Sequence, residues 1–162
     1  DVDVIGRGLP KGEFGFGNTL TYRNFDLNFF FRGVYGHDLV NLHRTMFEQV
    51  SRISTYNLIK TNYFQPEYKG PVAYNSHYVE NASFIKLDNL SLGYNFKLPS
   101  QSIISQARLY ITGQNLFYIT DYSGVDPEPR YSYEGNVLAP GIEPLNSWVT
   151  TRTFTLGVNL TF

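Results

Sequence analysis

The stretch Arg152-Thr-Phe-Thr-Leu-Gly-Val-Asn-Leu-Thr-Phe162 ends the chain and decides the predicted fold class. Its alternate residues form an apolar set and a small polar set, which is the pattern of a β-strand with two unlike faces. A strand that ends on an aromatic residue suits a membrane β-barrel, whose apolar face meets lipid and whose polar face lines the lumen. The last strand of a soluble sandwich shows the same alternation, so the rest of the chain must decide. The apolar set is Phe154, Leu156, Val158, Leu160 and Phe162.

The composition favours strands and excludes several functional classes. Aromatic residues make up 17% of the 162 residues, and charged residues make up another 17%, against about 25% charged residues in an average protein. The net charge of −1 gives no basic surface for nucleic acid. Without cysteine, the chain has no disulfide, no cysteine-ligated zinc and no thiol nucleophile. It also has no apolar run long enough for a transmembrane helix and no signal peptide at Asp1, so a barrel protein needs its export signal elsewhere.

The same alternation predicts four earlier strands, at residues 13–22, 25–34, 84–98 and 107–117. A tight turn at Arg23-Asn24 joins the first two. The many phenylalanines would promote aggregation in a soluble edge strand, whereas they are ordinary on a lipid-facing surface. A phosphate loop is a poor account of the glycines near residue 15, because no Gly-Lys-Ser/Thr and no helical pattern follow them. The predicted lipid-facing side chains are Phe25, Leu27, Phe29, Phe31, Leu90, Leu92, Tyr94 and Phe96.

The connections alternate in length. Those at 23–25 and 99–106 are short, and those at 37–79 and 118–147 are long. Outer-membrane barrels show this asymmetry, with short periplasmic turns and long outer loops. Because the count of about five strands is odd and below the minimum of about eight, the segment is not expected to close by itself. The sequence therefore predicts an all-β, antiparallel transmembrane β-barrel segment of a larger barrel, with two long extracellular loops, one of them partly helical.

The first long insertion begins with helical spacing at Leu39, Leu42, Met46, Val50 and Ile53. A helix packed on neighbouring loops is the favoured interpretation, and a partner-binding helix is the alternative. On another face of this helix, Arg44, Glu48 and Arg52 are spaced for ion pairs. Aromatic residues in the two insertions are candidate contacts for substrate or for a partner protein. They are Tyr63, Tyr68, Tyr74, Tyr131, Tyr133 and Trp148, the last of which also suits a membrane-interface belt.

Neither the histidines nor the loop carboxylates form a recognisable metal motif. His37, His43 and His77 lack the spacing of a helical metal pair. A calcium loop is the alternative for the second insertion, but the twelve-residue ligand pattern is absent and polar turn chemistry is favoured. No catalytic set emerges either. We therefore expect no metal, no cofactor and no enzyme activity. The loop carboxylates in question are Asp121, Asp126, Glu128 and Glu134.

An ordered series of motifs resembles the C-terminal portion of the SusC/RagA family of TonB-dependent outer-membrane transporters. Any one motif is weak, but together they recur in order over nearly the whole chain. The motifs are Gly15-Phe-Gly-Asn-Thr-Leu-Thr-Tyr-Arg-Asn-Phe-Asp-Leu27, Gly33-Val-Tyr-Gly36, Ala82-Ser-Phe-Ile-Lys-Leu-Asp-Asn-Leu-Ser-Leu-Gly-Tyr94, Gly113-Gln-Asn-Leu-Phe117, Thr120-Asp-Tyr-Ser-Gly-Val-Asp-Pro-Glu128 and the closing 152–162 stretch.

The resemblance implies a barrel of about 22 strands in the outer membrane of a Gram-negative bacterium. It implies import of large nutrients, glycans or peptides, with a SusD-like surface lipoprotein as lid and energy from the TonB complex. The plug and the TonB-contacting segment are N-terminal in that family, so neither is expected in residues 1–162. The closing strand, with Phe162 as its terminal aromatic, is expected to act as the membrane-insertion signal.

Two other functions remain open at this stage. The chain could belong to a structural SusC-like component of a larger outer-membrane complex. It could also be a soluble, aromatic-rich carbohydrate-binding module. Co-purifying partners distinguish the first from an importer, and solubility without detergent favours the second.

Overall fold

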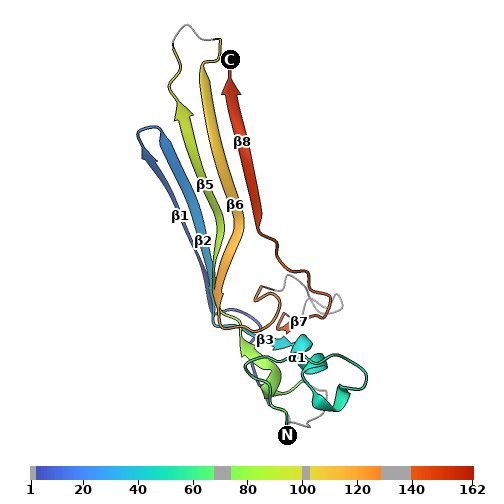
Figure 1. Ribbon diagram of the computed structural model, residues 1–162. Helices are drawn as coiled ribbons and strands as arrows, with labels where there is room; N and C mark the ends of the chain where they lie inside the picture. Colours follow the sequence, from blue (N-terminus) through green and yellow to red (C-terminus); the bar gives the residue numbers. More distant parts are fainter. Residues whose placement is uncertain (1–2, 68–73, 100–102, 129–139) are drawn as a thin grey trace. The chain divides into compact units, whose positions relative to one another are not determined.

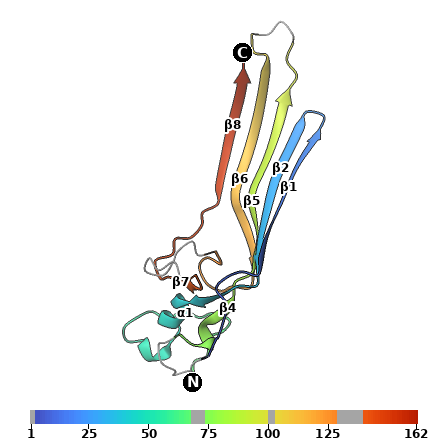
Figure 2. The ribbon, with the colours of Figure 1, turned by 180° about the vertical axis from the view of Figure 1, so that it is seen from behind.

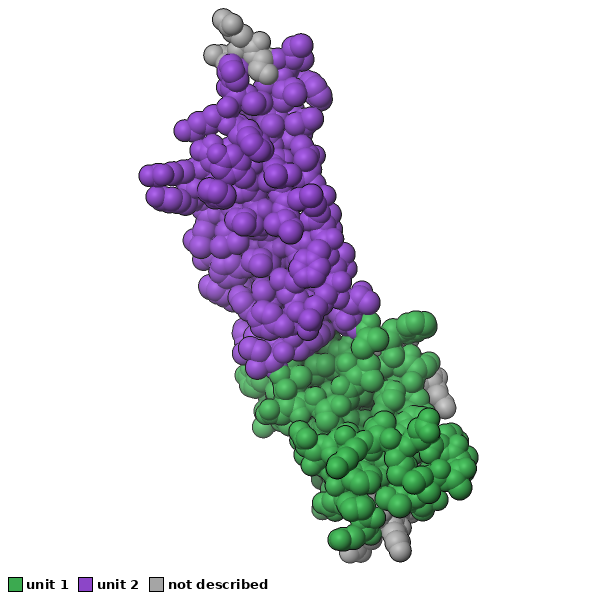
Figure 3. Space-filling view, viewed as in Figure 1, with its two compact units in different colours: residues 1–12, 34–84, 120–149 green, residues 13–33, 85–119, 150–162 purple. Residues whose placement is uncertain are grey.

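The computed structural model describes residues 3–67, 74–99, 103–128 and 140–162. The chain forms two compact units, coloured separately in Figure 3. Residues 13–33, 85–119 and 150–162 form the sheet unit, and residues 1–12, 34–84 and 120–149 form the loop unit. The loop unit thus combines the two long insertions with the start of the chain.

Five long strands form one sheet in the order β1-β2-β5-β6-β8, and they lie side by side in both views (Figure 1 and Figure 2). This confirms the five predicted strands, the turn at Arg23 and the all-β class. The strand β6 runs to Thr120, beyond the predicted end at Phe117, and β5 stops at Phe96 rather than Leu98. The strands are β1 (Gly12–Tyr22), β2 (Phe25–Tyr35), β5 (Phe84–Phe96), β6 (Gln106–Thr120) and β8 (Thr153–Thr161).

One face of this sheet is apolar. The antiparallel register of β6 with β8 places Leu109 opposite Val158 and Ile111 opposite Leu156, so their side chains share a face. Aromatic rings on β2, β5 and β6 extend this face through the edge-on contacts Phe25–Tyr94, Phe29–Phe31 and Phe31–Phe117. Within the sheet unit no other element packs on this face, and many of its large side chains are about half exposed or more. That this face meets lipid stays a prediction.

The opposite face carries polar and charged side chains. Arg32 donates to Asp88 at 2.8 Å, and Arg108 forms an ion pair with Asp26. Asn95 also donates to Asp26, at 2.9 Å. Because Asp26 and Arg32 are an even number of residues apart on β2, they share a face, and so must their partners Asp88 and Asn95. These two partners are an odd number apart on β5, so its alternation shifts by one residue between them, as in a β-bulge.

The loop unit contains a second, three-stranded sheet that the sequence did not predict. Its order is β4-β3-β7, with β3 (Asp38–Asn41) antiparallel to β4 (Val79–Asn81) and parallel to β7 (Ile142–Glu143). The sheet therefore joins both insertions. Sequence patterns miss such strands because two to four residues are too few for a visible alternation.

The prediction of a partly helical first insertion is confirmed, but the helix is shorter than the helical spacing from Leu39 to Ile53 indicated. Leu39 lies in β3, and the helix α1 covers only Leu42–Phe47, followed by the 3-10 turn η1 (Val50–Arg52); a second 3-10 turn, η2 (Ser76–Tyr78), precedes β4. Asn41 caps α1 by accepting a hydrogen bond from the Arg44 amide at 3.0 Å. At Gln49 the backbone is extended, with ψ of 117°, which ends the helical path. No helix among the described residues has the length and apolarity needed to cross a membrane.

Glycines let the start of the chain lie directly on this small sheet. The Arg7 carbonyl accepts from the Asp38 amide at 2.7 Å, and the Gly141 carbonyl accepts from the Val40 amide at 2.8 Å. A Cβ added at Gly8 would lie 2.6 Å from the backbone of Gly141. Since backbone cannot move aside as a side chain can, a larger residue at Gly8 must push the two segments apart.

We expect Gly8→Ala to destabilise the loop unit by about 1–3 kcal/mol through this overpacking. Exchange of the Val40 amide for deuterium should accelerate, because its acceptor on Gly141 is displaced. Gly17→Ala is the matched control, because the atom nearest to its Cβ would belong to the Phe30 ring, at 3.2 Å, and the nearest backbone atom, the Phe29 carbonyl oxygen, would lie 3.8 Å away. Unchanged exchange at Val40 in Gly8→Ala would contradict the packing described here.

Candidate functional site

The loop unit holds the described candidate contact residues at its surface. Tyr63, Tyr74 and Trp148 are 44%, 53% and 89% exposed. The Arg44 guanidinium lies under the Tyr63 ring, 4.6 Å from its centroid, which fixes that ring by a cation–π contact. The other candidates, Tyr68, Tyr131 and Tyr133, lie outside the described residues, as does Glu134.

Arg44 is the centre of a buried ionic cluster beneath this surface. It is 1% exposed and donates to Glu48 at 2.8 Å and to Glu80 at 2.8 Å. It also donates to the His77 carbonyl at 3.1 Å. The predicted Arg44–Glu48 pair is confirmed, but it is buried rather than exposed. Arg52 does not join it and instead contacts the Met46 sulfur, at 3.7 Å, and the Tyr56 ring.

Glu80 connects this cluster to the second insertion. Its Oε1 accepts from Arg44, from the Asn41 amide group at 3.2 Å and from the Ser123 hydroxyl at 2.8 Å, while its Oε2 accepts from the Ser123 backbone N–H at 2.8 Å. Both oxygens of a carboxylate that is 6% exposed are thus satisfied. The donors come from both insertions, so one side chain holds two distant parts of the sequence together.

Glu143 makes a second buried connection. It is fully buried on β7, and its two oxygens accept from the Tyr122 hydroxyl and from the Asp126 backbone N–H, each at 2.7 Å. His43 Nδ1 from α1 lies 3.9 Å away. Burial raises the pKa of Glu143, and its hydrogen bonds offset this only in part. Burial and the nearby Glu143 charge raise the pKa of Tyr122, which therefore stays protonated as a donor.

Two of the predicted candidates, His77 and Asp126, make local structural contacts. Burial and the neighbouring Arg44 charge lower the pKa of His77, so its ring is neutral at pH 7. Within the described ranges, no group of three or more His, Asp or Glu residues could hold a metal ion. Asp126 accepts from the Glu128 backbone N–H at 2.9 Å, which is turn chemistry of the predicted kind.

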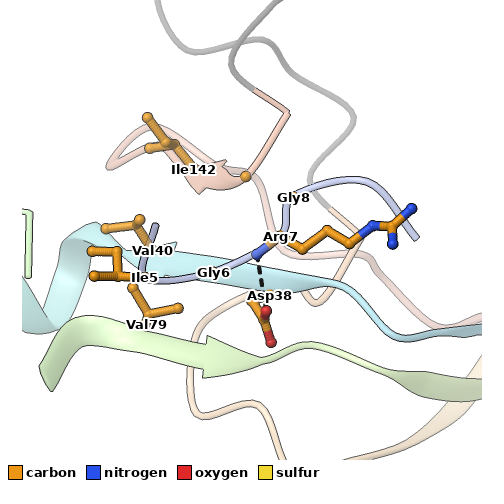
Figure 4. Close-up of a pocket in the computed structure, with 9 residues that line it drawn as sticks. Ile5, Gly6, Arg7, Gly8, Asp38, Val40, Val79 and Ile142 are labelled. Carbon is orange, nitrogen blue, oxygen red and sulfur yellow. Dashed lines mark hydrogen bonds between the residues drawn. The ribbon is translucent and has the colours of Figure 1, made fainter. Parts of the chain in front are cut away.

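A small apolar pocket lies where the start of the chain crosses β3. Its volume is about 140 Å³, and Ile5, Val40 and Val79 point together into it (Figure 4). The Asp38 carboxylate at its edge already accepts from the Arg7 backbone N–H at 3.0 Å, the dashed line in Figure 4. The three apolar side chains therefore suit contact with one small apolar group.

The polar face of the sheet unit is also hollowed, with a volume of about 500 Å³. Residues of β5, β6 and β8 line this hollow, and the β6–β8 register places Arg108 beside Asn159. Arg108 is held by Asp26 rather than free to move. The hollow thus offers amide and hydroxyl groups for hydrogen bonding, together with the apolar side chains of Phe96 and Ala107.

Comparisons with known proteins agree with this architecture. No family model matches the chain. It is 34% identical over its full length to TonB-dependent receptor P3 of Formosa agariphila. It is 26% identical, over 94% of its length, to TonB-dependent receptor SusC of Bacteroides thetaiotaomicron. The chain spans 17% and 15% of the length of these two relatives.

Solved structures share the fold. The RagAB peptide transporter superposes with a TM-score of 0.71 over 96% of this chain and 17% of that chain, at 23% identity. The RagAB peptide importer in its open-open state superposes with a TM-score of 0.67 over 95% of this chain and 17% of that chain, at 22% identity. An all-β barrel-wall segment with these sequence relatives belongs to the SusC/RagA family of TonB-dependent receptors.

Arg44→Met tests the buried cluster. Removing the guanidinium leaves Glu48 and Glu80 buried without their cation, and breaking such a pair costs about 3–5 kcal/mol. We expect a loss of that size in the free energy of unfolding, measured by chemical denaturation in detergent. Arg52→Met is the control, with an expected change within about 0.5 kcal/mol. Equal losses in the free energy of unfolding for the two variants would show that the buried cluster does not stabilise the loop unit more than the Arg52 contacts do.

Glu143→Gln tests the pH dependence. Because the pKa of Glu143 is raised above its ordinary 4.5, the group stabilises the fold below that pH, and this contribution is lost as pH rises through the raised pKa. The variant cannot ionise, so its stability relative to the parent should rise with pH across this window. A pH-independent difference for Glu143→Gln would contradict the raised pKa.

Proposed function

We propose that the chain is the C-terminal part of the barrel of an outer-membrane importer in a Gram-negative bacterium, and that the whole protein takes up large nutrients, glycans or peptides. The observation that carries this is the uncovered apolar face of the five-stranded sheet. A soluble protein rarely exposes so large an apolar surface, whereas a bilayer satisfies it. The full-length match to TonB-dependent receptors supports the same conclusion.

In this proposal one face of the sheet contacts lipid and the other lines the interior of the barrel. Lipid meets the predicted lipid-facing side chains, which are the set that begins with Phe25 and ends with Phe96. It also meets the alternate residues of the last strand, from Phe154 to Phe162. The opposite face, with the Asp26–Arg108 pair, lines the interior. Strands β1 and β8 are the edges of the described sheet. Their backbone groups need the remaining barrel strands as partners, since lipid offers no hydrogen bonds.

The loop unit is the proposed outer surface. Tyr63, Tyr74 and Trp148 are the described residues that would contact a SusD-like lipoprotein or the nutrient, because exposed aromatic side chains are good anchors for either. A solved relative in fold is described as a peptide importer, which favours peptide as one substrate class. Energy from the TonB complex would enter through parts of the protein outside residues 1–162. No enzymatic step and no cofactor are part of the proposal.

The alternative is a structural SusC-like component of a larger outer-membrane complex, which would share the same barrel wall. A soluble carbohydrate-binding module is disfavoured, because the apolar face would then lie in water.

The deciding experiment is isolation of the native protein from membranes in detergent, with its intact mass and its co-purifying proteins determined. An importer should appear as a species much larger than 18.6 kDa, accompanied by a surface lipoprotein and requiring detergent. A structural component should bring other barrel proteins and no ligand. A lone 18.6 kDa species, soluble without detergent, would refute the importer.

Trp148→Ala should weaken binding of the lid lipoprotein by about tenfold or more, as loss of an aromatic anchor does. The dissociation constant is measured with the purified lipoprotein and the detergent-solubilised parent protein. Val149→Ala is the matched control, because Val149 is the next residue and is also largely exposed. If both variants bind as the parent does, Trp148 is not a lid contact.

A further inference from the structure

The two long insertions are joined at several independent points within the loop unit. Besides the Glu80–Ser123 bonds, His37 Nε2 lies 3.1 Å from the Pro127 carbonyl, and the Thr120 hydroxyl donates to the Ser83 carbonyl at 2.9 Å. The parallel pairing of β3 with β7 adds backbone contacts. These contacts link residues 37–83 with residues 120–143, which are separated in sequence by two strands of the large sheet.

The apolar core of the loop unit is shared in the same way. Its buried hydrophobic cluster consists of Leu39 and Ala82 with Tyr122. The first two precede β5 and the third follows β6. Separating the insertions would therefore expose part of this cluster to water as well as break the polar links.

We propose that Glu80 locks the described parts of the two insertions into a single body, so that these parts open, close and unfold together rather than as two independent loops. This inference concerns the movement of the loops and holds whether or not the whole protein is an importer.

The charge balance of the buried cluster makes separation of the two insertions all-or-none. Arg44 faces two buried carboxylates, Glu48 and Glu80. Moving the second insertion away removes both Ser123 donors from Glu80 and leaves that carboxylate under-satisfied inside the unit. A buried charge with missing partners is costly, so partial separation is unfavourable and the first insertion must open with the second.

Hydrogen exchange followed by mass spectrometry tests this in the full-length protein in detergent. Ser123→Ala removes only the hydroxyl donor, on the second insertion. We expect exchange to accelerate about tenfold both in residues 120–127 and in residues 38–48, because the loop unit opens as one cooperative unit. Arg44→Met, on the first insertion, should accelerate exchange in the same two regions, since coupling is reciprocal.

Glu67→Gln is the control for removal of a charge on the first insertion, at an exposed position, and it should leave both regions unchanged. Unchanged exchange in β8, residues 153–161, checks that the sheet unit of each variant is folded. Acceleration confined to 120–127 in Ser123→Ala would overturn the proposal, because it would show that the second insertion moves alone. If the importer hypothesis fails, no surface lipoprotein will co-purify with the protein, but exchange in the two regions will still be coupled.

Discussion

The uncovered apolar face of the five-stranded sheet is the constraint on which the rest of the structure depends. The five strands produce one face rich in Phe, Leu, Val and Tyr and another that carries most of the Thr, Asn, Arg and Asp side chains. If the apolar face meets lipid, as proposed, the opposite face lines the interior of the barrel. Every backbone group in the bilayer must then be paired, so the edge strands β1 and β8 need partner strands beyond the described sheet.

The loop unit follows a different physical rule. Its stability depends on charges that are buried and paired, in contrast to the exposed ion pairs of an ordinary loop. Glu80 and Glu143 satisfy their oxygens with donors from both insertions. Small-residue contacts such as Gly8 against Gly141 let the backbone of the two segments approach closely. Two loops that look separate in the sequence therefore form one folded surface, and aromatic residues such as Tyr63 are held in place by the cluster beneath.

Periodicity predicted the sheet unit well, because each strand is long enough for its alternation to be visible. The alternation of apolar and polar residues therefore predicted the final strand and the strand that contains Phe25 to Phe31. The loop unit could not be predicted in the same way. The parallel pairing of β3 with β7 is a long-range contact between short segments, and no local pattern indicates it. Helical spacing from Leu39 to Ile53 was misleading, because tertiary pairing of β3 and the extended backbone at Gln49 outweighed local preference.

Burial of charge was equally invisible in the sequence. Arg44 and Glu48 have the spacing of a solvent-exposed ion pair, and nothing local distinguishes them from Arg52, which stays outside the cluster. Glu80, Ser123 and Glu143 gave no signal of their own, although Ser123 lies within a motif that carries the family resemblance. Motifs of this type record long-range contacts that periodicity does not detect.

The residue shift in β5 shows how the strand serves two environments. Lys86 and Asp88 share parity with Leu90 and Leu92, so a regular strand would place all four on one face. The shift before Ser91 separates them: Asp88 keeps its bonds with Arg32 and Lys86 on the polar face, and Ser91 accepts from Thr112 on that same face. Leu90 and Leu92 are thereby turned to the apolar side. An extra residue in the strand, which costs local pairing, is thus what lets a charged cluster and an apolar row occupy one continuous β-strand.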